Sequence, residues 1–154
     1  MDFNVFSDEF FMRQAIEEAK KAMKKDEVPI GAVIVCQNQI IARAHNLCES
    51  LNDATAHAEM IAITSASATI NDWRLSDSFL FVTKEPCPMC AGAIMNARVS
   101  NIYFGMFDGE KGCCGSLYQI CRDPRFNHQS NVTGGIMELD CAELLKSYLK
   151  SKRQ

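Results

Sequence analysis

Two short motifs that together offer three metal-binding side chains constrain the fold of this 154-residue chain more than any other feature. The first motif is His57-Ala58-Glu59, and the second is Pro86-Cys87-Pro88-Met89-Cys90. Cys87 and Cys90 are three residues apart, so both sulfur atoms lie on one face if a helix begins there. Pro88 favours a first helical turn, and the positive end of a helix lowers the pKa of a thiol toward the thiolate that binds metal. Any fold of the chain must therefore bring the two motifs together.

The side chains in these motifs indicate zinc with an open coordination position. One histidine and two cysteines make three protein ligands, whereas a structural zinc uses four and a catalytic zinc leaves one position for water. Cys48 is the nearest further ligand, and it lies in an expected loop. Glu59 is too close to His57 to be a comfortable fourth ligand, and it is well placed to move protons to and from bound water. The competing interpretation of the two cysteines is a thiol–disulfide redox pair, which the upstream motif disfavours.

The composition is that of an ordinary soluble globular protein, with 47% hydrophobic and 23% charged residues. We expect one domain over residues 1–154, because a chain of this length can bury a core of its own. No signal peptide or membrane span is evident, so we expect a cytoplasmic protein. Eight cysteines at irregular spacing suit a reduced state. We expect the vicinal pair Cys113-Cys114 to be two small apolar residues in a turn.

Hydrophobic periodicity predicts alternating helices and strands. Apolar residues at helical spacing indicate a first helix with Ser7 as its N-cap, and Gln37-Asn38 is typical of a hairpin turn. The expected elements are a helix over 7–25, strands over 30–36 and 39–46, a polar loop over 48–55, a helix carrying His57 and Glu59, a strand over 78–83, a helix over 88–97, a strand over 101–105 and a C-terminal helix at about 140–152. This order predicts an α/β fold with helices on both faces of a sheet.

The strand–helix–strand unit over residues 78–105 is expected to form a right-handed parallel crossover. Both metal-binding motifs then lie at the starts of helices, and the cysteine motif follows the carboxyl end of a strand. Open α/β sheets bind their ligands at such ends. The predicted metal site therefore agrees with the predicted fold.

Segments over nearly the whole length resemble the bacterial tRNA-specific adenosine deaminases of the cytidine-deaminase-like superfamily. The order H-x-E followed by P-C-x-x-C is itself typical of zinc-dependent nucleobase deaminases. The segments that carry the resemblance are 27–33 (EVPIGAV), 53–59 (DATAHAE), 85–90 (EPCPMC), 104–108 (FGMFD), 115–117 (GSL) and 126–128 (FNH). The chain departs from the family pattern at Ala54, where proline is frequent, at Lys84, where an apolar residue is usual, and at Cys113-Cys114, where small residues are common.

The resemblance implies a three-layer fold with a central mixed sheet, and hydrolytic deamination of the wobble adenosine in a tRNA anticodon loop to inosine. It implies one zinc ion per subunit, held by His57, Cys87 and Cys90, which activates water for attack on C6 of adenine. Glu59 would take the proton from that water and deliver it to the base and to the departing amine. It also implies a homodimer in which both subunits contribute to the RNA surface.

Further site residues follow from the resemblance. Asn46 matches a residue that hydrogen-bonds the purine, although a turn residue satisfying its own loop is the alternative. Asp108 matches an acidic residue near the sugar of the target nucleotide, and it could equally be structural. Asn127 and His128 resemble RNA-contacting residues. We expect His45 to be a surface residue rather than a ligand.

The overall charge alone does not indicate nucleic-acid binding. The chain has a net charge of −3 and a pI of about 5.6, whereas a basic domain is the usual footprint of a nucleic-acid binder. The last nine residues contain four basic and no acidic side chains: Lys146, Lys150, Lys152 and Arg153. Such a segment can bind phosphates or simply complement a helix dipole. The tRNA anticodon stem-loop as partner therefore rests on the resemblance.

Three functional hypotheses follow. The first is a tRNA wobble-adenosine deaminase, and the second is a related deaminase of a free base or nucleoside, such as guanine or cytosine. The third is a zinc-bearing scaffold without catalytic activity. Glu59 argues against the scaffold, because a scaffold needs no proton shuttle beside an open metal position.

Overall fold

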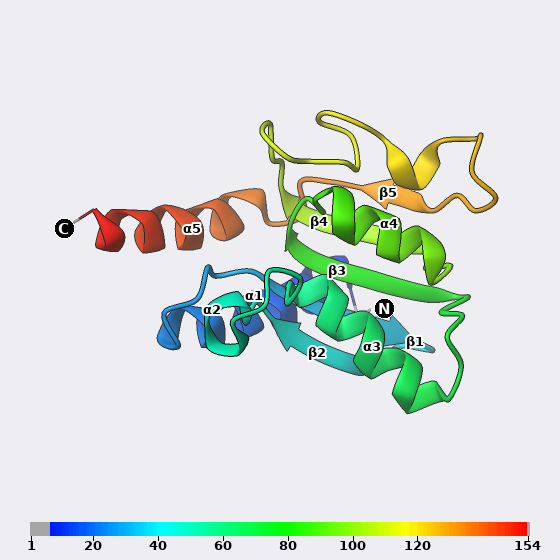
Figure 1. Cartoon of the computed structure of the whole chain (residues 1–154), viewed down its shortest axis with the longest axis horizontal. Coiled ribbons are helices and arrows are strands. Elements are labelled where there is room, and N and C mark those ends of the chain that lie inside the picture. The colour runs from blue at the N-terminus through cyan, green and yellow to red at the C-terminus, as the bar shows by residue number, and fades with distance from the viewer. Residues whose placement is uncertain (1–6, 154) are drawn as a thin grey trace, which may run out of the picture.

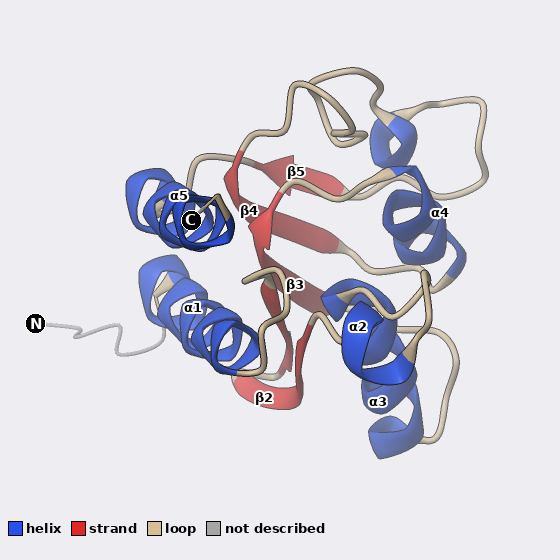
Figure 2. Cartoon of the chain, turned by 60° about the vertical axis from the view of Figure 1, so that its left-hand side comes forward, coloured by secondary structure: helices blue, strands red, loops and turns tan. Residues whose placement is uncertain are grey.

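The structure, a computed structural model, describes residues 7–153. Five strands form one mixed sheet in the order β2-β1-β3-β4-β5 (Figure 1). The strands are β1 (Gly31–Cys36), β2 (Gln39–His45), β3 (Ser78–Lys84), β4 (Asn101–Met106) and β5 (Asn131–Thr133). The helices are α1 (Asp8–Lys24), α2 (Cys48–Leu51), α3 (Ala58–Ile70), α4 (Pro88–Asn96) and α5 (Glu138–Lys152), with a 3₁₀ turn η1 (Ile120–Arg122). Figure 2 shows α1 and α5 on one face of the sheet and α2, α3 and α4 on the other, which confirms the expected fold class.

Strand direction determines which ends of the elements meet. β1 pairs antiparallel with both β2 and β3, so β2 runs in the same direction as β3. β3, β4 and β5 are parallel neighbours, as expected for the unit over 78–105. The carboxyl ends of β2, β3 and β4 therefore lie at one edge of the sheet, together with the residues that enter β1.

The central strands are buried on both sides, which explains their near-continuous apolar sequences. Alternate residues of β1 face opposite layers, because successive side chains of a strand point to opposite faces. Ala32 and Ile34 belong to the core beneath α3 and α4, and Val33 and Val35 belong to the core beneath α1.

The first helix packs directly onto the first strand. Ser7 caps α1 as expected, since its hydroxyl accepts a hydrogen bond from the backbone N–H of Phe10 at 3.2 Å. A Cβ atom at Gly31 would lie only 2.0 Å from the carbonyl oxygen of Ala15. Glycine at this position therefore permits the close approach of α1 to β1.

Three features differ from the sequence expectation. The expected loop over 48–55 contains the short helix α2, and neither η1 nor β5 was expected. β3 also continues through Lys84. β5 has only three residues and no buried side chain, so it carries no hydrophobic alternation from which to predict a strand. No helix in the described part of the chain combines the length and apolar character needed to cross a membrane.

Candidate active site

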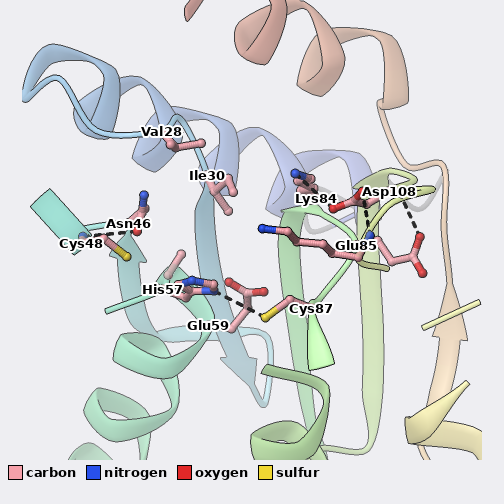
Figure 3. A pocket seen from close by; sticks show the side chains of 12 residues that line it. Val28, Ile30, Asn46, Cys48, His57, Glu59, Lys84, Glu85, Cys87 and Asp108 are labelled. Carbon is pink, nitrogen blue, oxygen red and sulfur yellow. Dashed lines mark hydrogen bonds and ion pairs between the residues drawn. The ribbon is translucent and has the colours of Figure 1, made fainter. Parts of the chain in front are cut away.

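A pocket of about 280 Å³ opens at the edge where β2, β3 and β4 end. Its lining includes Asn46 directly after β2, Lys84 at the end of β3, and Asp108 shortly after β4. Figure 3 shows Asn46 on one side and Lys84 with Asp108 on the other, with His57, Glu59 and Cys87 between them. Residues from distant parts of the sequence meet here because their strands run in the same direction.

Three candidate metal ligands lie at the starts of two helices. His57 is the N-cap residue of α3 and Cys87 is the N-cap residue of α4, and neither side chain caps its own helix. Nδ1 of His57 lies 3.6 Å from Sγ of Cys87 and 3.5 Å from Sγ of Cys90. These three ligand atoms lie within 4.8 Å of one another.

The donor set fits zinc. Tetrahedral zinc with a Zn–N bond of about 2.0 Å and a Zn–S bond of about 2.3 Å separates nitrogen from sulfur by about 3.5 Å. The two N···S distances agree with this separation. No fourth His, Cys, Asp or Glu joins the group among residues 7–153, so the set leaves one position open. His57, Cys87 and Cys90 are thus a candidate catalytic zinc site.

The environment of the thiols favours metal binding. Hydrogen bonds from Cys90 and from the His57 ring lower the pKa of Cys87 to about 4. The pKa of Cys90 is raised, because its thiol donates to Cys87 and is buried. The pair therefore already carries one thiolate at neutral pH, which is the form that binds zinc.

Glu59 lies in the first turn of α3, two residues after His57, and is 4% exposed. Burial raises the pKa of its carboxyl group. A raised pKa makes this carboxylate a stronger base than an ordinary exposed one, which suits a general acid and base. Its position beside the metal ligands in the same pocket suits proton transfer rather than metal binding.

The alternative roles considered for the cysteines receive no support from the geometry. All eight cysteines are free thiols. Cys48 lines the pocket, but its Sγ faces the carbonyl oxygen of Ala54 at 3.9 Å and is not part of the metal group. Cys113 and Cys114 are buried in the core, and Sγ of Cys114 lies 3.9 Å from Sγ of Cys121.

Asn46 and Asp108, two of the four residues expected to contact the substrate, both line the pocket. Asn46 is 7% exposed, and its Oδ1 accepts a long hydrogen bond of 3.4 Å from the N–H of Cys48. Asp108 uses Oδ1 to accept the backbone N–H groups of Glu110 and Lys111, while Oδ2 pairs with Lys84 at 3.2 Å. Asp108 can therefore stabilise its own loop and still lie beside a nucleotide in the pocket.

Asn127 and His128, in contrast, lie at the opposite edge of the sheet. They precede β5, which runs parallel to β4, and His128 Nε2 lies 2.9 Å from the carbonyl oxygen of Val99, which precedes β4. Their RNA contact stays a prediction, and it concerns a surface outside the pocket.

The expectation that His45 is a surface residue is wrong. Its side chain is only 11% exposed, and Nε2 lies 3.0 Å from Nζ of Lys25. The residue is no ligand, because it does not belong to the metal group. The end of β2 is covered by the end of α1, which the sequence pattern did not indicate.

Two buried glutamates that sequence reasoning did not assign hold the loops on either side of the pocket. Glu27 accepts the backbone N–H groups of Glu49 and Ser50 in α2. Glu85 accepts the backbone N–H groups of Asp108, Cys114 and Ser116. In the sequence, each of these glutamates appears only as an acidic residue near an apolar strand. The groups that they bind are backbone N–H groups, which all residues except proline have, so no residue pattern predicts which loop each glutamate holds.

Known proteins share both the fold and the motifs. A model of the cytidine and deoxycytidylate deaminase zinc-binding region matches residues 6–106. The tRNA-specific adenosine deaminase of Bacillus subtilis (strain 168) is 48% identical over 147 residues, which cover 96% of this chain and 91% of the relative.

Solved structures agree with this assignment. One structure, from a study of A-to-I editing by tRNA:A34 deaminases at the wobble position of transfer RNA, has a TM-score of 0.84 and 42% identity, covering 88% of this chain and 98% of that chain. The guanine deaminase of Bacillus subtilis has a TM-score of 0.62 and 36% identity, covering 70% of this chain and 66% of that chain. The match over residues 6–106 and the near-full-length identity show that this chain belongs to the zinc-binding cytidine and deoxycytidylate deaminase family, among the tRNA-specific adenosine deaminases.

Proposed function

We propose that this protein hydrolytically deaminates the wobble adenosine of a tRNA anticodon loop to inosine. The observation that carries the proposal is the convergence of His57, Cys87 and Cys90 with the buried Glu59 in one pocket. One relative named above is a tRNA-specific adenosine deaminase, one solved structure comes from a study of tRNA:A34 deaminases, and these matches cover 96% and 88% of this chain.

Each functional residue of the pocket has its own role in the reaction. His57, Cys87 and Cys90 would hold a zinc ion, which would supply an activated water as the nucleophile. Glu59 accepts the proton of the attacking water and delivers it to the ring nitrogen beside C6. The same carboxyl group then takes the second proton, from the hydroxyl added at C6, and passes it to the amine as the C6–N bond breaks, so that adenosine and water give inosine and ammonia. The amide of Asn46 can hydrogen-bond a purine edge from the opposite side of the pocket.

An unpaired loop base suits a pocket of this size. A cavity of about 280 Å³ can take one base, and loop bases can be splayed out and read on their edges. α5 carries Lys146 and Lys150, and Arg153 is its C-cap residue; these cations line one groove and are suited to bind phosphates of the stem. Lys152 pairs with Asp26, so its charge is partly neutralised.

The proposal includes a homodimer in the cytoplasm, with residues 1–154 forming one catalytic domain. Apolar side chains remain exposed on and beside the α2–α4 face: Leu51 at 59%, Leu117 at 50% and Tyr118 at 68%. A second subunit would remove this surface from water. Free cysteines and a tRNA substrate suit a reducing, RNA-containing compartment. Analytical ultracentrifugation of the zinc-loaded protein tests the dimer.

The function is tested by incubating the zinc-loaded protein with an anticodon stem-loop that carries adenosine at the wobble position. Free adenosine, guanine and cytidine are assayed in parallel, and inosine and ammonia are measured. We expect inosine in the stem-loop alone, with Glu59→Ala abolishing its formation. Turnover of a free base without RNA would instead establish the second hypothesis, a base or nucleoside deaminase. Absence of any turnover in a protein with stoichiometric zinc would favour the scaffold.

A further inference from the structure

A lysine occupies the rim of the pocket, where it has no role in the chemistry described above. Lys84 is the last residue of β3, its side chain is 25% exposed, and it lines the pocket. Lys111 is a second cation in the same lining. Adenine and ribose are neutral, so neither group of a free nucleoside explains why two lysines face this pocket.

The contacts of Lys84 leave most of its hydrogen-bonding capacity available. An ammonium group has three N–H donors. Among residues 7–153, the one polar contact of this ammonium group is the ion pair with Oδ2 of Asp108 at 3.2 Å. Oδ1 of the same carboxylate is engaged by two backbone N–H groups, so Asp108 is held in place independently of the lysine. A further anion can therefore approach Lys84 without dismantling the loop.

Among residues 7–153, no acid of the pocket other than Asp108 forms an ion pair with Lys84. Both oxygens of Glu85 are engaged by donors from the loop over 108–116. Glu59 is buried beside the metal ligands. Lys84 and Lys111 thus line the rim with Asp108 as the acidic partner of Lys84, while the charged Glu85 directs its oxygens to donors of the loop.

We propose that Lys84 binds a backbone phosphate adjacent to the reacting nucleoside and thereby selects an adenosine within RNA over a free nucleoside. This inference rests on the proposed function. An internal adenosine carries a phosphate on each side, whereas a free nucleoside has none. Partial burial strengthens such a contact relative to one between fully exposed charges. Lys84 is accordingly a specificity-determining residue at the mouth of the catalytic pocket.

A simpler role for Lys84 is to neutralise Asp108. The two roles predict different responses to the charge of the phosphate. If Lys84 contacts a phosphate, neutralising that phosphate weakens the wild-type complex, and the loss disappears when the lysine is absent. If Lys84 serves only Asp108, the effects of changing the lysine and the phosphate are independent of each other.

The test uses stem-loop RNAs in which one phosphate is replaced by a neutral methylphosphonate. The replacement is placed directly 5′ of the target adenosine, directly 3′ of it, or in the stem as a control. kcat/KM for inosine formation is measured for wild type, for Lys84→Met, which keeps the unbranched stem, and for Lys20→Met on the exposed face of α1. We expect the wild type and Lys20→Met to lose about tenfold with one of the two adjacent replacements, the range for one charge-assisted hydrogen bond at a partly exposed site. Lys84→Met should lose less than about twofold with the same RNA.

Salt dependence provides a second readout. The RNA-binding constant K falls as salt concentration rises. Loss of one phosphate contact to single-stranded RNA reduces the magnitude of the negative slope of log K against log salt concentration by about 0.7. We expect this decrease in Lys84→Met and in the double variant Lys84→Met/Asp108→Asn, but not in Lys20→Met. Recovery of the wild-type slope in the double variant would show that Lys84 only neutralises Asp108. Equal methylphosphonate penalties in wild type and Lys84→Met would also overturn the inference while leaving the deaminase function intact. Absence of inosine from the unmodified RNA with wild-type protein would instead refute the proposed function, and the phosphate role with it.

Discussion

Replacement of Glu27 by glutamine tests whether a buried carboxylate maintains one side of the pocket. Glu27 is fully buried, and its Oε1 accepts the N–H of Glu49 at 3.0 Å. Its Oε2 accepts the N–H of Ser50 at 2.6 Å and also the hydroxyl of Ser50. These bonds fix the start of α2, which lies between Asn46 and His57 in the sequence. Glu27 therefore holds the segment that joins a substrate-binding candidate to a metal ligand.

Glutamine keeps the shape of Glu27 but replaces one acceptor oxygen with an NH₂ donor. The hydroxyl of Ser50 can rotate and accept a bond from that group, whereas a backbone N–H cannot. One backbone N–H then loses its acceptor, and the remaining bonds lose the carboxylate charge. The loss of a charge-assisted hydrogen bond at a buried carboxylate lowers the free energy of unfolding by about 2 kcal/mol. That is a substantial part of the 5–15 kcal/mol that is typical of a domain.

The effect should depend on pH with a defined sign. Burial alone raises the pKa of Glu27, but the hydrogen bonds from Ser50 and Glu49 outweigh it and hold the pKa below the ordinary value of 4.5. A carboxyl group whose pKa is lower in the folded than in the unfolded state stabilises the fold above the unfolded pKa, and this contribution is lost as the pH falls through the folded pKa. The difference between wild type and Glu27→Gln should therefore be constant above about pH 5 and shrink below about pH 4.5.

The assay is urea unfolding followed by far-UV circular dichroism, at fixed protein and zinc concentrations. The matched control is Glu17→Gln, because Glu17 is exposed on α1 and, among residues 7–153, pairs with the exposed Lys20 alone. We expect the control to change the free energy of unfolding by less than about 0.5 kcal/mol. Hydrogen exchange should show faster exchange at the amides of Glu49 and Ser50 in Glu27→Gln. A loss below about 0.5 kcal/mol, or one that persists unchanged at pH 3, would refute this role of the carboxylate.

Three further predictions concern the metal, the proton shuttle and the opposite loop. Glu59→Gln should lower the rate of inosine formation by at least about 100-fold while zinc remains bound, as measured by metal analysis of the purified variant. Cys90→Ala should lose both zinc and activity, and chelator treatment of the wild type should do the same until zinc is added back; full activity without zinc would contradict the metal assignment. Glu85→Gln should accelerate hydrogen exchange across residues 108–116, because at least one of the backbone N–H groups of Asp108, Cys114 and Ser116 loses its acceptor; unchanged exchange would rule out the anchoring role.

Most of the secondary structure could be predicted because it rests on local patterns. The amphipathic repeat of α1, the hairpin turn at Gln37-Asn38 and the apolar run of β1 each lie within a short window of sequence. Gln37 and Asn38 have φ values of 52° and 60°, as a tight hairpin turn requires. The metal ligands were equally recognisable, since residue type and spacing determine which side chains can bind zinc.

The features that could not be predicted depend on contacts between distant segments. α2 lies within the segment 48–55 that was expected to be a loop, and it is held by a carboxylate more than twenty residues earlier, so no local pattern predicts it. The placement of Asn127 and His128 depends on β5 joining the sheet parallel to β4, which three residues with only Val132 partly buried do not indicate. His45 is covered by the end of α1, a tertiary contact without a local signal.

In this pocket, the residues at the rim that would contact the substrate are separate from the metal ligands and Glu59. A change at the rim can therefore alter substrate selection and leave the chemistry of deamination unchanged. The metal ligands and Glu59 lie at the starts of α3 and α4, within elements that pack against the sheet. Lys84 is the last residue of β3, and Asp108 lies in the loop shortly after β4. Their side chains reach the rim of the pocket rather than the core. A substitution at the rim alters charge next to the substrate without moving a ligand of the metal. Lys84 lies at such a position, so its substitution is expected to change RNA affinity while the same deamination continues.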